Sequence, residues 1–413
     1  MRSALHLLAA CSLWFLAAVP AAHADEPARH TVEFPAWSRT YAGTVDGRRV
    51  EVALTRVDGR VEGAYCAAPC ARNGEESIRI EGTIRGDQVR LSELRPDAAG
   101  TPVHAASWHA RLRGGRMSGT RVRAGSSAAQ RFDLEDTRPL PYETTVVADS
   151  RPTNDDACGT PPRVVAIKLY RGRRLVQRLA TDSQGTCQMF VPRAVDANFD
   201  GKADLTIALT LPAGPNIPYQ TWLSDGHGRR FVPGPAVLQD IPSPWYDGEH
   251  KLVVSSWRGS CCSHGVTTYR WHGTKLVEEE TVESYALPVL ADDGKRRYCY
   301  AAPTYIEGQI VFEDRVEERD GRLTITVADV GACEDSYGVA PDTRIDIWQP
   351  GPGRAWRIAR TEEVNWRPVT DGERTHYCPE VPFFDHGRIV RIVLDGDDYA
   401  ACSDDAPQTP PSQ

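Results

Sequence analysis

Short stretches in which apolar and polar residues alternate, separated by glycine turns, follow one another from residue 38 to residue 135. Val50, Val52 and Leu54 alternate before Asp58-Gly59, and a second glycine turn stands at Gly114-Gly115. A period of two is typical of strands with one buried face, and Asp-Gly or Gly-Gly supplies the positive φ of tight hairpin turns. The pattern predicts an antiparallel β-meander over residues 25–140, closed into a barrel or folded into a sandwich.

A segment rich in proline and acidic residues, 138–157, interrupts this pattern and predicts a domain boundary. Alternation then resumes, and Leu205, Ile207, Leu209 and Leu211 share one face of a strand. Further strands are expected at Val165–Leu169, Leu252–Trp257, Thr267–Trp271, Leu323–Val327, Arg344–Trp348, Trp356–Arg360 and Ile389–Leu394. Because no long apolar stripe of period 3.6 occurs, helices should be minor. We expect an all-β protein with a β-propeller-like domain over 157–402 and a disordered tail at 403–413.

The first residues predict export. Arg2 is followed by an apolar stretch from Leu5 to Val19, and Ala22-His23-Ala24 is a small-residue cleavage site, so residues 1–24 are expected to be a signal peptide. Leu8 to Cys11 also matches the tetrapeptide of a lipidated cysteine. The apolar run continues well past Cys11, which favours cleavage over lipoprotein anchoring there. We therefore expect the protein in the periplasm or secreted.

Cysteine usage agrees with an oxidising compartment. The chain has 11 cysteines, and the loss of Cys11 leaves an even number, which is typical of a disulfide framework. Proximity along the chain favours Cys66–Cys70, Cys158–Cys187, Cys299–Cys333 and Cys378–Cys402. Cys261 and Cys262 remain, either as a vicinal bridge or bonded elsewhere. No zinc-type spacing of Cys and His is present.

Charge and hydropathy exclude two classes of protein. The formal net charge is −8, which argues against a nucleic-acid binder and favours a cationic partner. The apolar content of 41% suffices for packed cores, and no second long apolar run follows the first. We therefore expect no membrane span in the exported chain.

One stretch has metal-ligand spacing. Asp196, Asn198, Asp200 and Asp204 occupy positions 1, 3, 5 and 9 of a loop, Gly201 occupies position 6, and Lys202 at position 7 offers a backbone carbonyl. This spacing surrounds one hard cation with oxygen atoms, as Ca²⁺ requires. Position 12 is Ile207 where an EF-hand has glutamate, and the loop precedes a strand. The expected role is structural and the expected affinity weak; the alternative is an Asp/Asn turn without metal.

A search for catalytic motifs finds none. The sequence lacks a G-x-S-x-G elbow, an H-E-x-x-H pair, a P-loop and a dinucleotide-binding glycine motif. The most unusual stretch is Trp257–Gly265, where two adjacent cysteines stand between two predicted strands. Loops on a β scaffold often bind partners. The candidate partner-binding residues are Arg258, Ser260, Ser263, His264 and Tyr269; the alternative is a merely cross-linked hairpin.

The segment from about 160 to 280 resembles the exported calcium-loop β proteins related to FG-GAP propellers. The resemblance rests on the following segments: Asp196–Leu205, Pro215-Asn216, Tyr219–Leu223, Arg230–Val232, Pro244–Asp247, Arg258-Gly259, Tyr269–Trp271, Gly273 and Lys275-Leu276. Characterised members include periplasmic immunity proteins that inhibit lysozyme-like effectors delivered by type IV secretion. The resemblance implies calcium ligation by Asp196, Asn198, Asp200 and Asp204. The meander also looks like a domain that often precedes such proteins.

These observations lead to one functional expectation. We expect a non-enzymatic, calcium-stabilised exported protein that binds a protein partner, such as a lysozyme-like cell-wall hydrolase. The inhibitory loop of the characterised members has no counterpart that the sequence identifies, and the cysteines and the C-terminal extension depart from the family pattern. The alternatives are a carbohydrate- or cell-wall-acting enzyme, whose carboxylate pair would form only in three dimensions, and a structural envelope protein.

Overall fold

The computed structural model describes residues 30–68, 70, 77–152, 162–184, 190–210, 214–225, 229–260, 263–327, 330, 333–334, 343–351, 356–394 and 402–403. The predicted signal peptide with Cys11, the Cys158–Cys187 pair, Cys261, Cys262 and residues 404–413 of the predicted tail lie outside these ranges. Within them the protein is all-β, as predicted, and the single α-helix described there has five residues, α1 (Ala236–Asp240).

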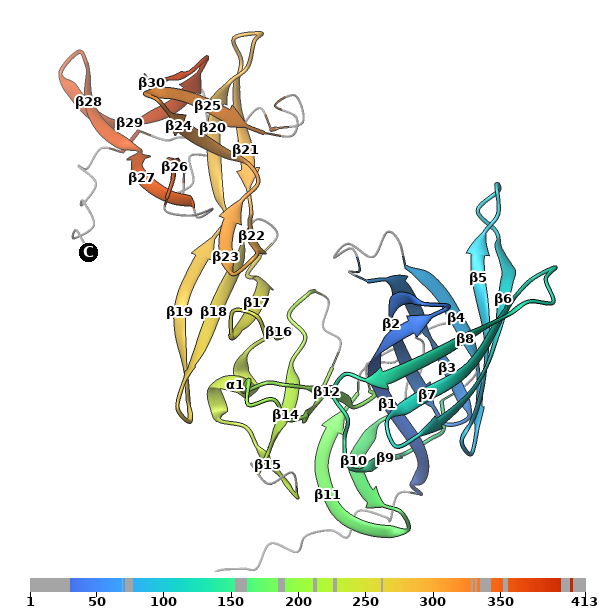
Figure 1. Cartoon of the computed structure of the whole chain (residues 1–413). Coiled ribbons are helices and arrows are strands. Elements are labelled where there is room, and N and C mark those ends of the chain that lie inside the picture. The colour runs from blue at the N-terminus through green and yellow to red at the C-terminus, as the bar shows by residue number, and fades with distance from the viewer. Residues whose placement is uncertain are drawn as a thin grey trace, which may run out of the picture.

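Eight antiparallel strands form a closed barrel at the N-terminal end of the described chain (Figure 1). They are β1 (Val32–Val45), β2 (Arg48–Val57), β3 (Arg60–Ala67), β4 (Ile78–Arg85), β5 (Gln88–Pro96), β6 (Pro102–Arg113), β7 (Arg116–Arg123) and β8 (Ala129–Asp136). Each strand pairs with the next, and β8 returns to β1 with Tyr41 opposite Asp136 and Val45 opposite Phe132. The predicted meander therefore closes as an up-and-down barrel.

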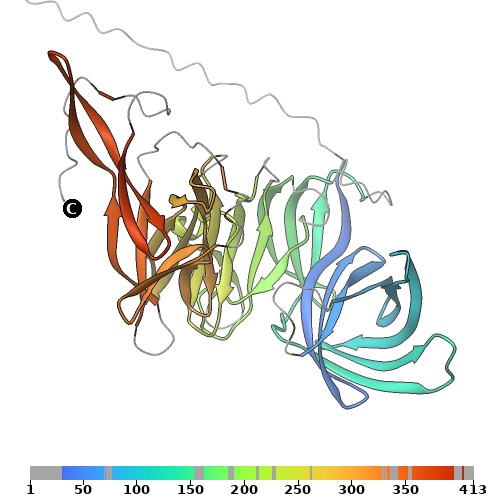
Figure 2. The ribbon, with the colours of Figure 1, turned by 90° about the horizontal axis from the view of Figure 1, so that it is seen from above.

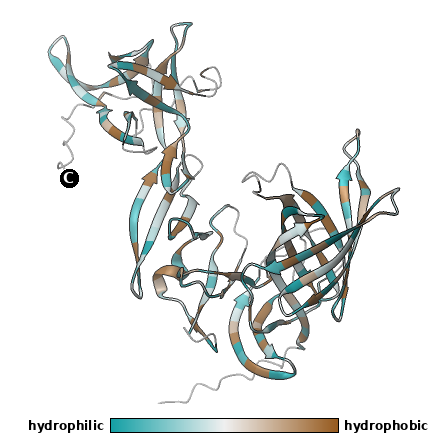
Figure 3. Cartoon of the chain, in the orientation of Figure 1, coloured by the Kyte–Doolittle hydropathy of each residue, from teal (hydrophilic) through white to brown (hydrophobic). Residues whose placement is uncertain are grey.

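Alternating residues of the barrel strands fill its interior. Val50, Val52 and Leu54 of β2 are all buried, and Glu51 and Ala53 between them are exposed. Brown and teal alternate along these strands in Figure 3. Two aromatic residues, Trp108 and Phe132, pack with ring centroids 4.8 Å apart inside the barrel. Because side chains of one parity bury apolar surface, the period of two fixes which face of each strand turns inward.

The first strand belongs to the barrel and also to the sheets that follow. Its start, Val32–Pro35, pairs with β9 (Glu143–Ala148), and Ser38 lies opposite Arg193 of β12 (Arg193–Val195) in parallel. The remaining strands of this sheet are β10 (Val164–Arg171), β11 (Arg174–Ser183), β13 (Asp204–Ala208), β14 (Tyr219–Ser224) and β15 (Phe231–Pro233). Strand β9 lies inside the proline-rich segment where the sequence predicted a boundary.

The rest of the described chain forms small separate sheets. One sheet contains β16 (Trp245–Asp247), β17 (Leu252–Arg258), β18 (His264–His272) and β19 (Lys275–Glu283). The other strands are β20 (Tyr285–Leu290), β21 (Arg296–Ala301), β22 (Pro303–Ile306), β23 (Gln309–Phe312), β24 (Arg315–Arg319), β25 (Arg322–Thr326), β26 (Arg344–Pro350), β27 (Trp356–Glu363), β28 (Asn365–Asp371), β29 (Arg374–Asp385) and β30 (Arg388–Val393). Seen from above, the sheets follow one another in a row away from the barrel (Figure 2). Their pairings do not show the predicted propeller.

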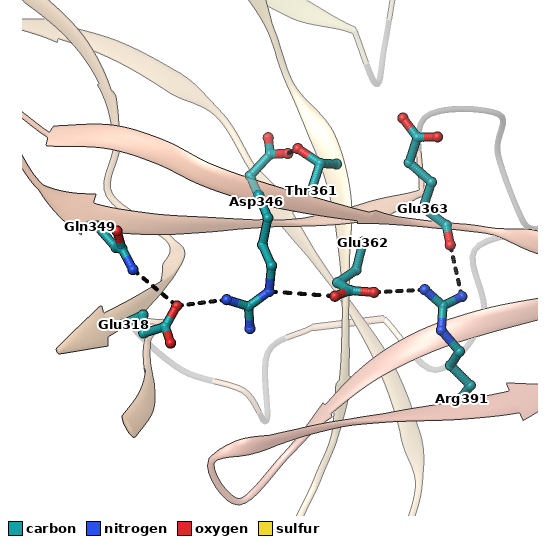
Figure 4. A network of polar contacts seen from close by, with 8 residues as sticks. Glu318, Asp346, Gln349, Thr361, Glu362, Glu363 and Arg391 are labelled. Carbon is teal, nitrogen blue, oxygen red and sulfur yellow. Dashed lines mark hydrogen bonds and ion pairs between the residues drawn. The ribbon is translucent and has the colours of Figure 1, made fainter. Parts of the chain in front are cut away.

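Disulfides and ion pairs connect strands of the C-terminal sheets. Cys299–Cys333 and Cys378–Cys402 are disulfides, as predicted, and Cys66–Cys70 is a third in the barrel. A chain of ion pairs also links strands of two sheets (Figure 4). Arg360 donates a hydrogen bond of 2.7 Å to the carboxylate of Glu318, and Arg391 of β30 donates one of 2.7 Å to the carboxylate of Glu362. The ion pairs thus connect β24 and β27 of one sheet with β30 of another.

Candidate metal loop and partner surface

The predicted metal loop lies between β12 and β13, so both of its ends are fixed by strand pairing. Phe199 and Gly201 have φ of 58° and 80°, which turns the chain back on itself. Oδ2 of Asp196 accepts a hydrogen bond of 3.2 Å from the amide of Gly201. Oδ1 of Asn198 accepts from the amide of Asp200 at 3.1 Å, and Oδ1 of Asp200 accepts from Lys202 at 2.9 Å. The bonds of Asn198 and Asp200, each to the amide two residues on, are those of Asx turns, and the bond of Asp196 closes the loop over five residues.

Asp204 begins β13 and is fully buried. Its Oδ2 accepts from the amide of Ala197 at 2.8 Å, and its Oδ1 accepts from the amide of Ser224 at 2.7 Å. Burial raises the pKa of Asp204 to about 6, and the negative charges of Asp200 and Asp196 act in the same direction. The loop therefore concentrates carboxylates whose mutual repulsion a cation would relieve.

The residues of the loop fit a cation in part. No three His, Cys, Asp or Glu side chains converge as a metal site in the described part of the chain. Nevertheless Oδ1 of Asp196 is buried without a hydrogen-bond partner, which is costly for a carboxylate oxygen. An oxygen that accepts a hydrogen bond from one amide keeps a second lone pair for another donor or a cation. Asp196, Asn198 and Asp200 therefore retain acceptor capacity, and the ammonium of Lys202 lies 4.0 Å from Asp200 Oδ2.

The loop also joins two sheets. The indole Nε1 of Trp271, in β18, donates 2.8 Å to the carbonyl of Ala197, and Nζ of Lys251 donates 3.2 Å to the carbonyl of Phe199. Phe199 and Ala197 pack in one apolar cluster with Leu276 of β19. The conformation of the loop thus determines how the sheet of β16–β19 lies on the strands β12–β15.

A cavity of about 880 Å³ adjoins the loop on the side of the barrel. Asp196 and Lys202 line it from the loop, and Glu51 and Arg138 line it from the barrel and the segment after it. Solvent cations can therefore approach the first ligand position of the loop from this cavity.

The predicted partner-binding residues separate into two places. Arg258, Ser260, Ser263 and His264 lie together where β17 and β18 meet, and the amides of Gly259 and Ser260 both donate to the carbonyl of Ser263. Arg258 exchanges two backbone bonds, of 2.8 and 2.7 Å, with the side chain of Asn216. His264 Nδ1 contacts the hydroxyl of Tyr300. These bonds tie the described residues at the hairpin end to one another, to Asn216 and to Tyr300.

Tyr269 lies farther along β18, away from this group. It packs against the apolar cluster beside the metal loop, and partial burial raises its pKa, as does the charge of Glu278. It therefore supports the loop and stands apart from the surface at the hairpin end.

One polar cluster was not predicted from the sequence. Asp247 Oδ2 accepts from the hydroxyl of Tyr305 at 2.7 Å and contacts Nδ1 of His250 at 2.8 Å. Burial alone would raise the pKa of Asp247, but these hydrogen bonds outweigh it and lower the pKa. Tyr305 stands 58 residues after Asp247, so no local motif indicated the cluster.

Comparisons with known proteins add the following. Residues 286–407 match the model of a domain family of unknown function (DUF8339), a region that begins in β20 and includes every later strand. No curated protein matches the chain. A solved structure of a Xanthomonas protein related to the type IV secretion system is 13% identical, covering 48% of this chain and 93% of that chain with a TM-score of 0.26. No helix within the described ranges has the length and apolarity to cross a membrane.

Proposed function

We propose that this protein is an exported, calcium-stabilised binding protein without catalytic activity, and that its partner is a lysozyme-like cell-wall hydrolase. The observation that carries the proposal is the loop Asp196–Asp204. It has oxygen atoms at the calcium spacing, a buried Asp196 oxygen without a partner, and direct bonds to the sheet that presents the candidate surface. Calcium supplies charge balance there when bound, and the chain supplies Asp196, Asn198, Asp200, the Lys202 carbonyl and Asp204 as ligands.

The candidate surface supports a protein partner because its described residues are hydrogen-bonded in place and two of them, Arg258 and Ser260, are exposed. It consists of Arg258, Ser260, Ser263 and His264 at the end of the β17–β18 hairpin. Gly265 lies directly under the indole of Trp257, where a Cβ would come within 2.2 Å of the ring. Trp257 in turn donates 2.9 Å to the hydroxyl of Thr267. A surface that is already ordered loses little conformational entropy on binding.

An acidic edge strand in the same sheet supports a cationic partner. Strand β19 is the last strand of its sheet, and Glu278, Glu279, Glu280 and Glu283 are all exposed. The pKa of Glu280 is raised by partial burial and by the charge of Glu279. Approach of a basic protein would lower this repulsion and accelerate association at low salt.

Export is supported by the signal-like segment at residues 1–24 and by the three disulfides among the described residues. These bonds form and persist in oxidising compartments such as the periplasm.

The test is an inhibition assay with purified, disulfide-bonded protein in millimolar calcium. Added to a cationic lysozyme-type hydrolase on peptidoglycan, it is expected to reduce lysis in proportion to its concentration. Replacement of Glu278 and Glu280 by lysine should weaken inhibition, and replacement of the distant residues Glu62 and Glu81 of the barrel should not.

The same assay without added hydrolase separates the alternative. Release of sugar by this protein alone would make it a cell-wall-acting enzyme and would overturn the proposal. Unchanged lysis over a panel of lysozyme-type hydrolases would exclude the hydrolase as the partner, and capture from an envelope extract would then identify another.

A further inference from the structure

A second cavity, of about 870 Å³, lies at one mouth of the barrel. The turns Gly86-Asp87 and Gly114-Gly115 form its barrel side, and the segment Pro139–Thr145 covers it together with the turn after β10. A volume of this size is within the range of pockets that hold small organic molecules. The metal loop does not line it, and nothing in the proposed function uses it.

Two arginines form the inner wall of this cavity. Arg39 of β1 retains 10% exposure of its side chain, and its Nε is buried without a hydrogen-bond partner in the described structure. Arg56 of β2 donates 2.8 Å from Nε to the backbone carbonyl of Asp58. Burial lowers the pKa of Arg56, and the positive charge of Arg39 lowers it further. The negative charges of Asp58 and Glu143 act in the opposite direction but do not outweigh burial. Two partly buried guanidinium groups therefore line the same cavity.

The carboxylates near the cavity compensate this charge only in part. Asp136 lies 3.4 Å from Nη1 of Arg39, a long ion pair, and also accepts 2.9 Å from the amide of Arg138. Asp87 accepts 2.7 Å from Arg113 at the rim. Asp58 is bound by Arg151, and Glu143 is exposed. Arg39, Arg56 and Arg171 line the cavity together with two carboxylates, Asp87 and Glu143. The lining therefore carries one more positive than negative charge, which favours an anion.

Part of the remaining wall is aromatic and apolar. Trp37 and Tyr142 are buried at 5% and 3% exposure, and Leu112 and Leu140 are partly buried against the two cores. The guanidinium of Arg39 lies 5.1 Å from the ring centroid of Trp37, and that of Arg171 lies 5.3 Å from the ring centroid of Tyr142. Such stacked pairs leave the edge of the guanidinium available to an oxyanion and place aromatic rings in the wall beside a bound ring.

We propose that the mouth of the barrel is a binding site for a small aromatic organic anion, a carboxylate or sulfonate, held by Arg39 and Arg56 with its ring against Trp37 and Tyr142. The anion supplies the acceptor that Nε of Arg39 lacks, and its apolar body displaces water from the aromatic wall. Arg171, at the exposed rim, assists entry.

The experiment uses two fluorescent probes that share a ring system, 8-anilinonaphthalene-1-sulfonate and the neutral N-phenyl-1-naphthylamine. We expect the native, disulfide-bonded protein to bind the sulfonate saturably with one site per chain, at least tenfold more tightly than the neutral probe. Arg56→Gln should weaken sulfonate binding at least tenfold and leave the neutral probe unchanged. Arg90→Gln, on the exposed face of β5, is the matched control and should change neither affinity by more than twofold.

Arg39 is buried, so Arg39→Lys provides a second variant that keeps the charge and removes the planar fork. It should weaken sulfonate binding while the near-ultraviolet circular dichroism stays native. Equal affinity for the two probes, or undiminished sulfonate binding in folded Arg56→Gln, would overturn the proposal. Displacement of the sulfonate by millimolar inorganic phosphate would overturn the requirement for an aromatic body.

Discussion

The indole of Trp271 and the carbonyl of Ala197 are joined by a hydrogen bond of 2.8 Å across two sheets. Trp271 lies near the end of β18, and Ala197 stands between the first two ligand positions of the metal loop. The bond therefore couples the loop to the strand that begins at the candidate partner surface. A change that destabilises the conformation of the loop should therefore also destabilise the sheet of β16–β19.

Trp271→Phe tests this coupling because it removes the N–H and keeps an aromatic ring. We expect the free energy of unfolding in calcium to fall by about 1 kcal/mol, the usual net value of one hydrogen bond, and calcium affinity to weaken. Trp257→Phe is the control, since its indole donates 2.9 Å to Thr267, away from the loop. Urea unfolding with and without calcium measures both effects. Equal calcium affinity in the two variants would show that the bond does not couple loop and sheet.

A buried ion pair inside the barrel should be necessary for its stability. Nε of Arg121 donates 2.8 Å to Glu93, both side chains are almost fully buried, and Arg95 donates to the second oxygen at 3.0 Å. Glu93→Gln leaves the Arg121 charge buried without its counter-ion, so we expect a loss of about 3 kcal/mol in the free energy of unfolding.

The matched control for the barrel pair is the exposed pair Arg79–Glu81, at 2.9 Å on the outer surface. Glu81→Gln should change the free energy of unfolding by less than about 1 kcal/mol, because solvent screens exposed pairs. Similar losses in the two variants would contradict a special role for burial.

Asp247 gives the sheet of β16–β19 a pH dependence. Its pKa is lowered in the folded protein by the hydrogen bonds from Tyr305 and His250, which outweigh burial. A carboxyl whose folded pKa is depressed contributes stability above its unfolded pKa, near 4, and loses it as the pH falls through the folded value. The difference in unfolding free energy between wild type and Asp247→Asn should therefore be largest at about pH 6 and shrink toward about pH 3. Urea titrations over this range measure it; a constant difference would exclude the carboxylate as its cause.

The disulfides should differ in their effect on stability according to the loops they close. Cys299–Cys333 spans 34 residues and Cys66–Cys70 spans 4. Loop-closure entropy gives about 4 kcal/mol for the first and about 2 kcal/mol for the second. Serine pairs at each position, compared by thermal unfolding, should show the larger loss for the pair at 299 and 333. The reverse order would mean that packing outweighs chain entropy at these sites.

Most strands were predictable because their chemistry is local. Alternation such as Val50, Val52 and Leu54 depends on a period of two, which any strand with one buried face shows. Proximity along the chain likewise identified Cys299–Cys333, since short separations are easily closed. Closure of the barrel was not predictable, because it depends on pairing of Tyr41 with the distant Asp136, and the alternation pattern is the same in a sandwich.

The candidate sites likewise divide into features that nearby residues form and features that join residues distant in the sequence. The loop Asp196–Asp204 is contiguous, and the spacing of its oxygen-bearing residues is enough to indicate a metal. The bond from Trp271 to Ala197 joins residues 74 positions apart, and Asp247 meets Tyr305 from another sheet. Tyr269 and His264 were both predicted to bind the partner, yet successive residues rise about 3.3 Å along a strand, which separates the two side chains along β18.

Calcium binding by the Asp196 loop is tested most directly by the unfolding temperature of the native protein in EDTA and in excess calcium. At a calcium concentration about 100 times the dissociation constant, binding should add about 2.7 kcal/mol to the free energy of unfolding and raise the unfolding temperature. Asp200→Ala should abolish this rise, whereas Asp97→Ala, which removes an exposed Asx turn between β5 and β6, should preserve it. An unfolding temperature that is the same in EDTA and in millimolar calcium would contradict the account and leave the loop as a turn without metal.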